Sequence, residues 1–303
     1  MGRISADVET LSRRKLTVVI GAALLLASLP ILVVYFVLMG SSFTNNMITG
    51  LTIGRLRLTL QNWILFFQGR LSTIPGQTLT TWDILRYIFN TFVVALGVMA
   101  VVTLLSTLAG YSFSRMKFSG RKFLMKLLIL LHAFPGVALI IAVYTIYVYV
   151  KLGLPSSLWT SYAFSYVIVA RAALEVPMSI WVMKGFFDKV PWEVEWSAII
   201  DGASRVRVWR QIVLPLVKPG IATVAIFSFL AGWEDLIYVL VFLPPTEKTL
   251  ATYIESLLAE GSLEVVHLPI VAAAGTLYLL PTILFFIFAR SYMLQSTAGG
   301  IKT

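Results

Sequence analysis

Residues 191–219 read PWEVEWSAIIDGASRVRVWRQIVLPLVKP, a polar and charged stretch between two long apolar runs. A loop that only reconnected two membrane spans would need a handful of residues. Gly202 can adopt the left-handed conformation that ends a helix, and Asp201 or Ser204 can cap the next one. The stretch therefore predicts a helix, a tight turn and a second helix at a membrane face, a rigid protrusion suited to docking a soluble partner. Its apolar side chains recur at helical spacing: Trp192, Trp196, Ile199 and Ala203.

The rest of the chain has the composition of a membrane protein. Of its 303 residues 58% are hydrophobic and 13% charged, with a mean hydropathy of +0.88, whereas soluble domains carry about 25% charged residues. A span needs roughly 20 apolar residues to cross a hydrocarbon layer of about 30 Å. We expect an all-α polytopic protein, one membrane domain over residues 17–294, with six transmembrane helices. The apolar runs are 17–39, 91–113, 123–150, 159–183, 221–242 and 269–288.

Lysine and arginine placement predicts the orientation. Positive charge gathers in the N-terminal tail (residues 1–16), between the second and third spans, in the loop 184–219 and around the C-terminal tail (residues 295–303). These segments share one side of a six-span protein, so both termini are predicted to be cytoplasmic. The external loop 40–90 also carries arginines, contrary to the positive-inside rule, but a loop of that length obeys the rule weakly. Its arginines are Arg55, Arg57, Arg70 and Arg86.

The net charge of +10 sits where anionic lipid headgroups lie, so it predicts contact with lipid and requires no nucleic acid. Cysteine is absent, which excludes disulfides and thiolate metal sites, and we predict no metal site. The phosphate-binding pattern GxxxxGK[ST] is also missing. We therefore expect no enzymatic activity and no cofactor on this chain; any ATP would be bound by another chain.

Four charged residues fall well inside predicted spans, away from their ends. Glu234 and Asp235, beside Trp233, lie in the run 221–242, where insertion scales put a central Asp at about +2.5 to 3.5 kcal/mol. They either line a wet pathway or pair with a neighbouring helix or chain. Arg171 and Glu175 stand four residues apart, share one helix face and can pair in the interior of the bundle. Prolines within the spans predict kinks: Pro30, Pro135, Pro177 and Pro281.

The stretch 191–219 resembles the cytoplasmic "EAA" coupling loop of binding-protein-dependent ATP-binding-cassette importers, in which EAA and a glycine precede I-x-L-P. Two elements fit the pattern: Asp201-Gly202-Ala203, and Ile212-Val213-Leu214-Pro215. The EAA triplet itself departs, because its positions hold Trp196-Ser197-Ala198, with Glu195 one residue early. The resemblance implies that this loop meets an ATPase subunit and makes Glu195 the substitute for the acidic group there.

Further elements resemble, in order along the chain, the shorter permease subunit of maltose-type carbohydrate importers. The resemblance implies a type I importer permease fold. The matching elements are Leu58-Thr59-Leu60-Gln61-Asn62-Trp63, Asn90-Thr91, the segment Ala109-Gly110-Tyr111-Ser112 through Arg115-Met116-Lys117-Phe118-Ser119-Gly120-Arg121, Phe134-Pro135, Lys151-Leu152-Gly153-Leu154, Gly185-Phe186-Phe187, Trp233-Glu234-Asp235, and Thr297-Ala298-Gly299-Gly300-Ile301-Lys302.

The family resemblance implies that the chain forms half of the translocation pathway for a sugar or oligosaccharide in the plasma membrane. Its partners would be a second, homologous permease, two ATPase subunits that hold ATP and Mg, and an external substrate-binding protein. The tail residues Thr297, Ala298, Gly299, Gly300 and Lys302 would insert between the ATPase subunits. Related permeases carry other solutes, such as glycerol phosphate, so that alternative stays open. A secondary transporter, expected to show related halves and no docking protrusion, and an intramembrane enzyme are less favoured.

Overall fold

The computed structural model is helical in the residues that it describes, with one isolated antiparallel bridge between Thr44 and Leu58. The described residues are 2–48, 56–69, 79–259 and 268–298. The chain forms two compact units, which we describe separately: unit 1 comprises residues 1–78 and 261–277, and unit 2 comprises residues 79–260 and 278–303.

Four described helices are long and apolar enough to cross a membrane, and the count rises to six if each of two bent helix pairs is one span. This agrees with a polytopic all-α protein. The four segments are Leu16–Ser42, Thr81–Arg115, Ser156–Asp188 and Leu268–Phe285. The bent pairs are Arg121–His132 with Gly136–Leu152, at 97°, and Arg205–Leu216 with Lys218–Trp233, at 73°.

Unit 1 contains α1 (Gly2–Ser42), α2 (Gln61–Phe67) and the first part of α13 (Leu268–Ala298). The side chain of Asn62, on α2, donates hydrogen bonds to two backbone carbonyls at the end of α1, that of its last residue Ser42 at 3.1 Å and that of Thr44 at 2.8 Å. These bonds fix α2 against the end of α1. Part of the predicted external loop 40–90 is therefore ordered structure.

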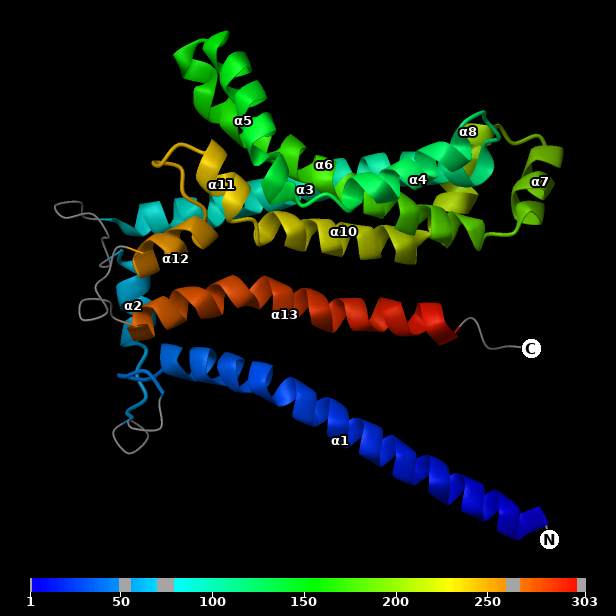
Figure 1. The fold of residues 1–303 in the computed structure, drawn as a ribbon, viewed down its shortest axis with the longest axis horizontal. Helices are drawn as coiled ribbons and strands as arrows, with labels where there is room; N and C mark the ends of the chain where they lie inside the picture. The colour runs from blue at the N-terminus through cyan, green and yellow to red at the C-terminus, as the bar shows by residue number, and fades with distance from the viewer. Residues whose placement is uncertain (1, 49–55, 70–78, 260–267, 299–303) are drawn as a thin grey trace. The chain divides into compact units, whose positions relative to one another are not determined.

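The core of unit 2 is formed by α3 (Thr81–Arg115), α6 (Trp159–Asp188) and α10 (Lys218–Trp233), which lie side by side (Figure 1). The contact between α3 and α6 is close because Gly110 has no side chain: an added Cβ would lie 2.7 Å from Cβ of Met183. Apolar side chains of the three helices fill the core, among them Val94, Val98, Val102, Val167, Met183 and Val224.

Helix α3 begins ten residues before the predicted span 91–113. Its start is fixed by Asp83, whose carboxylate accepts hydrogen bonds from the backbone N–H and the hydroxyl of Thr80, both at 2.8 Å. The second turn of α3 holds Arg86, which pairs with the buried carboxylate of Glu247. This ion pair neutralises the charge of one of the four arginines in the loop 40–90 that depart from the positive-inside rule.

Two predicted spans are broken. The run 123–150 divides into α4 (Arg121–His132) and α5 (Gly136–Leu152), with Pro135 in an extended conformation at the junction. The predicted kink is confirmed there, since proline lacks the N–H that would continue the helix. The run 221–242 divides into α10 and α11 (Ile237–Phe242).

The other prolines of the predicted spans lie inside continuous helices: Pro30 in α1, Pro177 in α6 and Pro281 in α13.

The remaining elements of unit 2 are short. The short elements are a 3₁₀ turn at Ser156–Leu158, α7 (Trp192–Ile200), α8 (Arg205–Val208), a π-helical segment at Trp209–Val213, α9 (Leu214–Leu216) and α12 (Leu250–Ala259).

Candidate functional site

The turn between α7 and α8 is built around Gly202. This glycine has φ of +87°, a left-handed conformation that strains a residue with a side chain. The backbone N–H of Gly202 donates to the carbonyl of Ile199, and that of Ala203 to the carbonyl of Ala198, each at 3.0 Å. Two such bonds satisfy the last carbonyls of α7 and end the helix sharply. The predicted helix end at Gly202 is confirmed.

The second helix starts at a side-chain cap. Of the two predicted candidates, Ser204 accepts a hydrogen bond from the backbone N–H of Arg207, at 3.4 Å, and Asp201 stays exposed on the turn. The chain then passes through the π-helical segment and α9, where Pro215 is exposed. The helix–turn–helix protrusion, defined here as residues 192–208, therefore has the predicted order of elements.

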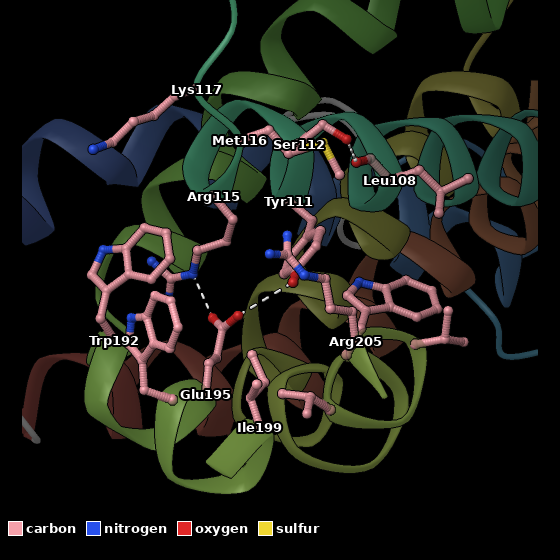
Figure 2. Close-up of a pocket in the computed structure, with 14 residues that line it drawn as sticks. Leu108, Tyr111, Ser112, Arg115, Met116, Lys117, Trp192, Glu195, Ile199 and Arg205 are labelled. Carbon is pink, nitrogen blue, oxygen red and sulfur yellow. Dashed lines mark hydrogen bonds and ion pairs between the residues drawn. The ribbon is translucent and has the colours of Figure 1, made fainter. Parts of the chain in front are cut away.

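The protrusion is anchored to α3 by a buried ion pair. Nε of Arg115, near the end of α3, lies 2.5 Å from a carboxylate oxygen of Glu195 on α7, and the two side chains are 5% and 6% exposed. The other carboxylate oxygen accepts from the hydroxyl of Tyr111 at 3.2 Å. The Arg115 guanidinium also donates to the carbonyl of Val190 at 2.6 Å and lies over the ring of Trp192 at 4.6 Å. Figure 2 shows both oxygens of Glu195 turned toward α3.

This geometry corrects the sequence interpretation of Glu195. Its carboxylate was expected to face an ATPase subunit, but both oxygens are bonded within the chain and the residue is buried. Taking a carboxylate out of water requires partners for its charge, and Arg115 supplies them. Glu195 therefore acts as a positioning residue for α7.

The outer face of the protrusion is apolar. Trp196 is 53% exposed, Ile200 81% and Val206 71%, and Ser197 is exposed beside them. Ala198 and Ala203 of the predicted coupling set are half-buried against the core of unit 2. Between this protrusion and the end of α3 lies a hollow of about 540 Å³ (Figure 2). An exposed apolar face on a rigid support is typical of a protein-binding surface.

A second connection holds the neighbouring end of α6 to α3. The hydroxyl of Ser114 donates to the carboxylate of Asp188 at 2.6 Å, and the same carboxylate pairs with Lys184. Asp188 immediately precedes the segment that leads into α7. The protrusion is thus attached to the helices of unit 2 at its entry and at α7 itself.

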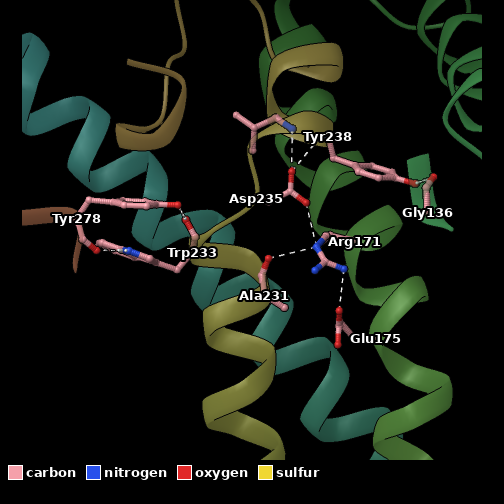
Figure 3. A network of polar contacts seen from close by, with 9 residues as sticks. Gly136, Arg171, Glu175, Ala231, Trp233, Asp235, Tyr238 and Tyr278 are labelled. Atoms are coloured by element: carbon pink, nitrogen blue, oxygen red, sulfur yellow. Dashed lines mark hydrogen bonds and ion pairs between the residues drawn. The ribbon is translucent and has the colours of Figure 1, made fainter. Parts of the chain in front are cut away.

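A polar network surrounds the break between α10 and α11 (Figure 3). Arg171, on α6, pairs with Glu175 at 2.8 Å and with Asp235 at 2.9 Å, and its Nε also donates to the carbonyl of Ala231 at 3.1 Å. The predicted pairing of Arg171 with Glu175 is confirmed. The second oxygen of Asp235 accepts from the backbone N–H of Tyr238 at 2.9 Å and so caps α11.

The three candidate residues at this break, Trp233, Glu234 and Asp235, have different environments. Glu234 and Asp235 were expected inside a span, whereas both lie between the two helices. Asp235 is buried and paired, but Glu234 is exposed and accepts a 3.4 Å hydrogen bond from the hydroxyl of Thr282. Trp233 is 2% exposed and donates its indole N–H to the carbonyl of Tyr278 at 3.0 Å, so it is a packing residue between helices.

The predicted tail contacts fall at the limit of the structure. Thr297 and Ala298 belong to the last turn of α13, so the helix continues past the predicted boundary at 294. Gly299, Gly300 and Lys302 lie outside the described residues. Among the described residues, no group of three or more His, Asp or Glu side chains is placed to hold a metal ion.

Sequence reasoning did not assign the anchoring role of Arg115 and Tyr111. Both occur in the segment that carried the family resemblance, three and seven residues before Phe118, yet no local pattern tells which distant residue they meet. The available signal was an arginine at the last turn of a span together with an acidic residue in the next polar loop. Such a pair is expected to form when both ends lie at the same membrane face.

These observations define a multi-pass membrane protein with a rigid helix–turn–helix that protrudes from the ends of its helices. Residues 102–293 match the family described as "Binding-protein-dependent transport system inner membrane component", and the chain belongs to this family. It is a permease component located in the cell membrane.

Relatives support the resemblance to carbohydrate-uptake permeases. The chain is 34% identical over 220 residues to the maltodextrin transport system permease protein MdxG of Bacillus subtilis (strain 168), covering 72% of this chain and 76% of that protein. It is 29% identical over 284 residues to the galactooligosaccharides transport system permease protein GanQ of the same organism, covering 92% and 94%. A chain of the bacterial alginate ABC transporter, solved with an alginate-bound periplasmic protein, has a similar fold: the TM-score is 0.66 at 18% identity, over 93% and 94% of the two chains.

Proposed function

We propose that this chain forms half of the translocation pathway of an ATP-driven importer for sugars or oligosaccharides, with ATP and Mg bound by separate ATPase subunits. The observation that carries the proposal is the protrusion: its exposed apolar face at Trp196, Ile200 and Val206 stands on a support fixed by a buried ion pair. A flexible loop would not transmit a partner's motion, because the loop itself could move without displacing the helices. A rigid element transmits that motion to the helices that hold it.

The mechanism follows from this rigidity. Closure of the ATPase pair moves the docked protrusion, and the ion pair between Arg115 and Glu195 passes the displacement to α3. The permease pair then changes between inward-open and outward-open states. Linkage requires that ATP and the loaded binding protein favour the same state, since each can shift the equilibrium only by its differential affinity.

The remaining features of the assembly are part of the same proposal. The protein has six spans, with α4 and α5 together forming the third and α10 and α11 together forming the fifth, and both termini are cytoplasmic because the basic loops gather on that side. A second, homologous permease completes the pathway, and an external binding protein delivers the solute. The C-terminal tail, with Ala298, Gly299 and Gly300, inserts between the ATPase subunits, where small residues fit a narrow cleft. Support for a sugar solute comes from the names of the relatives.

The test is purification of the tagged chain from its native membrane, followed by identification of the co-purifying subunits. We expect an ATPase, a second permease and ATP hydrolysis that rises when a sugar-loaded binding protein is added. Ile200→Asp places a charge at the most exposed apolar position of α7 and should reduce ATPase recovery, whereas Ile200→Val should not. Recovery without any ATPase, or equal recovery from both variants, would contradict the docking role of the protrusion.

A further inference from the structure

The lengths of α10 and α6 place the break between α10 and α11 inside the membrane, toward the face away from the protrusion. Helix α10 runs 16 residues from Lys218 to Trp233, about 24 Å at 1.5 Å per residue, out of a hydrocarbon layer of about 30 Å. Helix α6 gives the same depth, because Arg171 lies 17 residues before the end of the helix at Asp188. The break and its network therefore lie in the half of the layer away from the protrusion.

Non-helical backbone at this depth needs internal partners or water. Asp235 supplies the partners on one side, since it caps α11 and pairs with Arg171. Arg171 supplies one on the other side, since it donates to the carbonyl of Ala231, two residues before the end of α10. The contacts of Arg171 and Asp235 therefore fix the geometry of the break between the two helices (Figure 3).

The charges of this network do not balance. Arg171 is bonded to two carboxylates, Glu175 and Asp235, and Glu234 adds a third. Glu234 is exposed, and its contact among the described residues is the neutral hydroxyl of Thr282 at 3.4 Å. An exposed, unpaired carboxylate facing lipid is strongly disfavoured, which leaves water or a partner chain as its surroundings.

Resting on the proposed function, we propose that Glu234 is a solute-contacting residue of the translocation pathway. Its carboxylate accepts hydrogen bonds from the hydroxyls of an uncharged sugar and repels anionic solutes. An ionised carboxylate is an acceptor without donors, and its hydrogen bonds to hydroxyl groups are stronger than neutral ones. The site therefore fits a neutral, hydroxyl-rich solute and disfavours a sugar phosphate, a uronate or glycerol phosphate.

The electrostatic part can be tested without knowing the solute, because the chain has no cysteine. Thr282→Cys places a thiol beside Glu234 in the assembled transporter. Its reaction rates with a cationic and an anionic methanethiosulfonate reagent give a ratio, which is normalised to the ratio for 2-mercaptoethanol. We expect a preference for the cation of about tenfold, falling toward unity when Glu234→Gln removes the charge. Ser157→Cys, in the exposed turn before α6, should keep its ratio when Glu234 is changed.

The solute-binding part uses uptake of whichever neutral sugar the purified binding protein captures. Glu234→Gln should raise the KM for uptake about ten- to hundredfold, the value of a hydrogen bond to a charged group. Stimulation of ATP hydrolysis by the loaded binding protein should persist, and Glu255→Gln should leave uptake unchanged. Loss of stimulation in the unmodified transporter would refute the proposed function but leave the labelling ratio interpretable. A thiol at 282 that neither reagent reaches, or a ratio that Glu234→Gln does not alter, overturns the inference.

Discussion

Reversal of charge at Glu195 should uncouple the permease from its ATPase through a contact inside this chain. Glu195→Lys places a second cation against Arg115, and the site offers almost no water to screen it, because both side chains are about 5% exposed. Breaking a buried ion pair by changing one partner costs about 3 to 5 kcal/mol. Arg115 keeps the carbonyl of Val190 and the ring of Trp192, so we expect the lower end, about 3 kcal/mol.

A loss of that size lowers the population of the anchored protrusion by a factor of about 150. The assay is ATP hydrolysis by the reconstituted transporter, measured with and without loaded binding protein. Glu195→Lys should lose most of the stimulated rate. Glu193→Lys makes the same charge change two residues away on the exposed face of α7 and should retain the stimulated rate.

The location of the partner charge decides the interpretation. The charge swap Arg115→Glu with Glu195→Arg should restore part of the coupling within this chain, since it rebuilds an ion pair of opposite sense between α3 and α7. A double-mutant cycle measures this coupling energy directly. The reasoning fails if the swap gives no rescue while reversal of a basic residue on the ATPase does, because Glu195 would then face the partner subunit.

Two further changes test the turn and the tail. Gly202→Val puts a β-branched residue at φ of +87°, a strain of at least about 1 kcal/mol, although the position is open in space; stimulated ATP hydrolysis and uptake should fall together while membrane insertion, followed by cell fractionation, stays normal, and unchanged transport would contradict the strained turn. Deletion of the residues after Ser296 removes the proposed ATPase-contacting tail and should impair ATP turnover without altering insertion or solute capture by the binding protein; wild-type turnover from the truncated chain would show a dispensable end.

The sequence predicted the protrusion well because its signals are local. Helical spacing, a glycine at the turn and a serine after it are each decided within a few residues, and the structure has all three. The pair Arg171 and Glu175 belongs to the same class, since an interval of four residues places both on one helix face. Local geometry needs no knowledge of the fold.

The failures concern residues whose partners are far apart in the sequence. Glu195 pairs with Arg115, eighty residues away. For Asp235, pairing with a neighbouring helix was one of the two predicted alternatives and is confirmed, but the sequence did not identify Arg171 as the partner. Hydropathy also cannot show that a run of apolar residues is interrupted. The run 221–242 reads as one span because leucine, valine and phenylalanine flank the break on both sides. The two carboxylates were the signal of that break, since an acidic residue can cap a new helix as well as line a pathway.

The two ion-pair systems lie at opposite ends of the helices that connect them. Arg115 lies in the last turn of α3, Arg171 lies 17 residues before the end of α6, about 25 Å along the helix, and α3 and α6 pack closely through Gly110. A helix pair in such close contact cannot shear without displacing the side chains that surround it. Motion of the anchored protrusion must therefore reach the level of the break largely as a rigid displacement. There α10 is already divided from α11, so the wall of the pathway can change orientation without breaking a continuous helix.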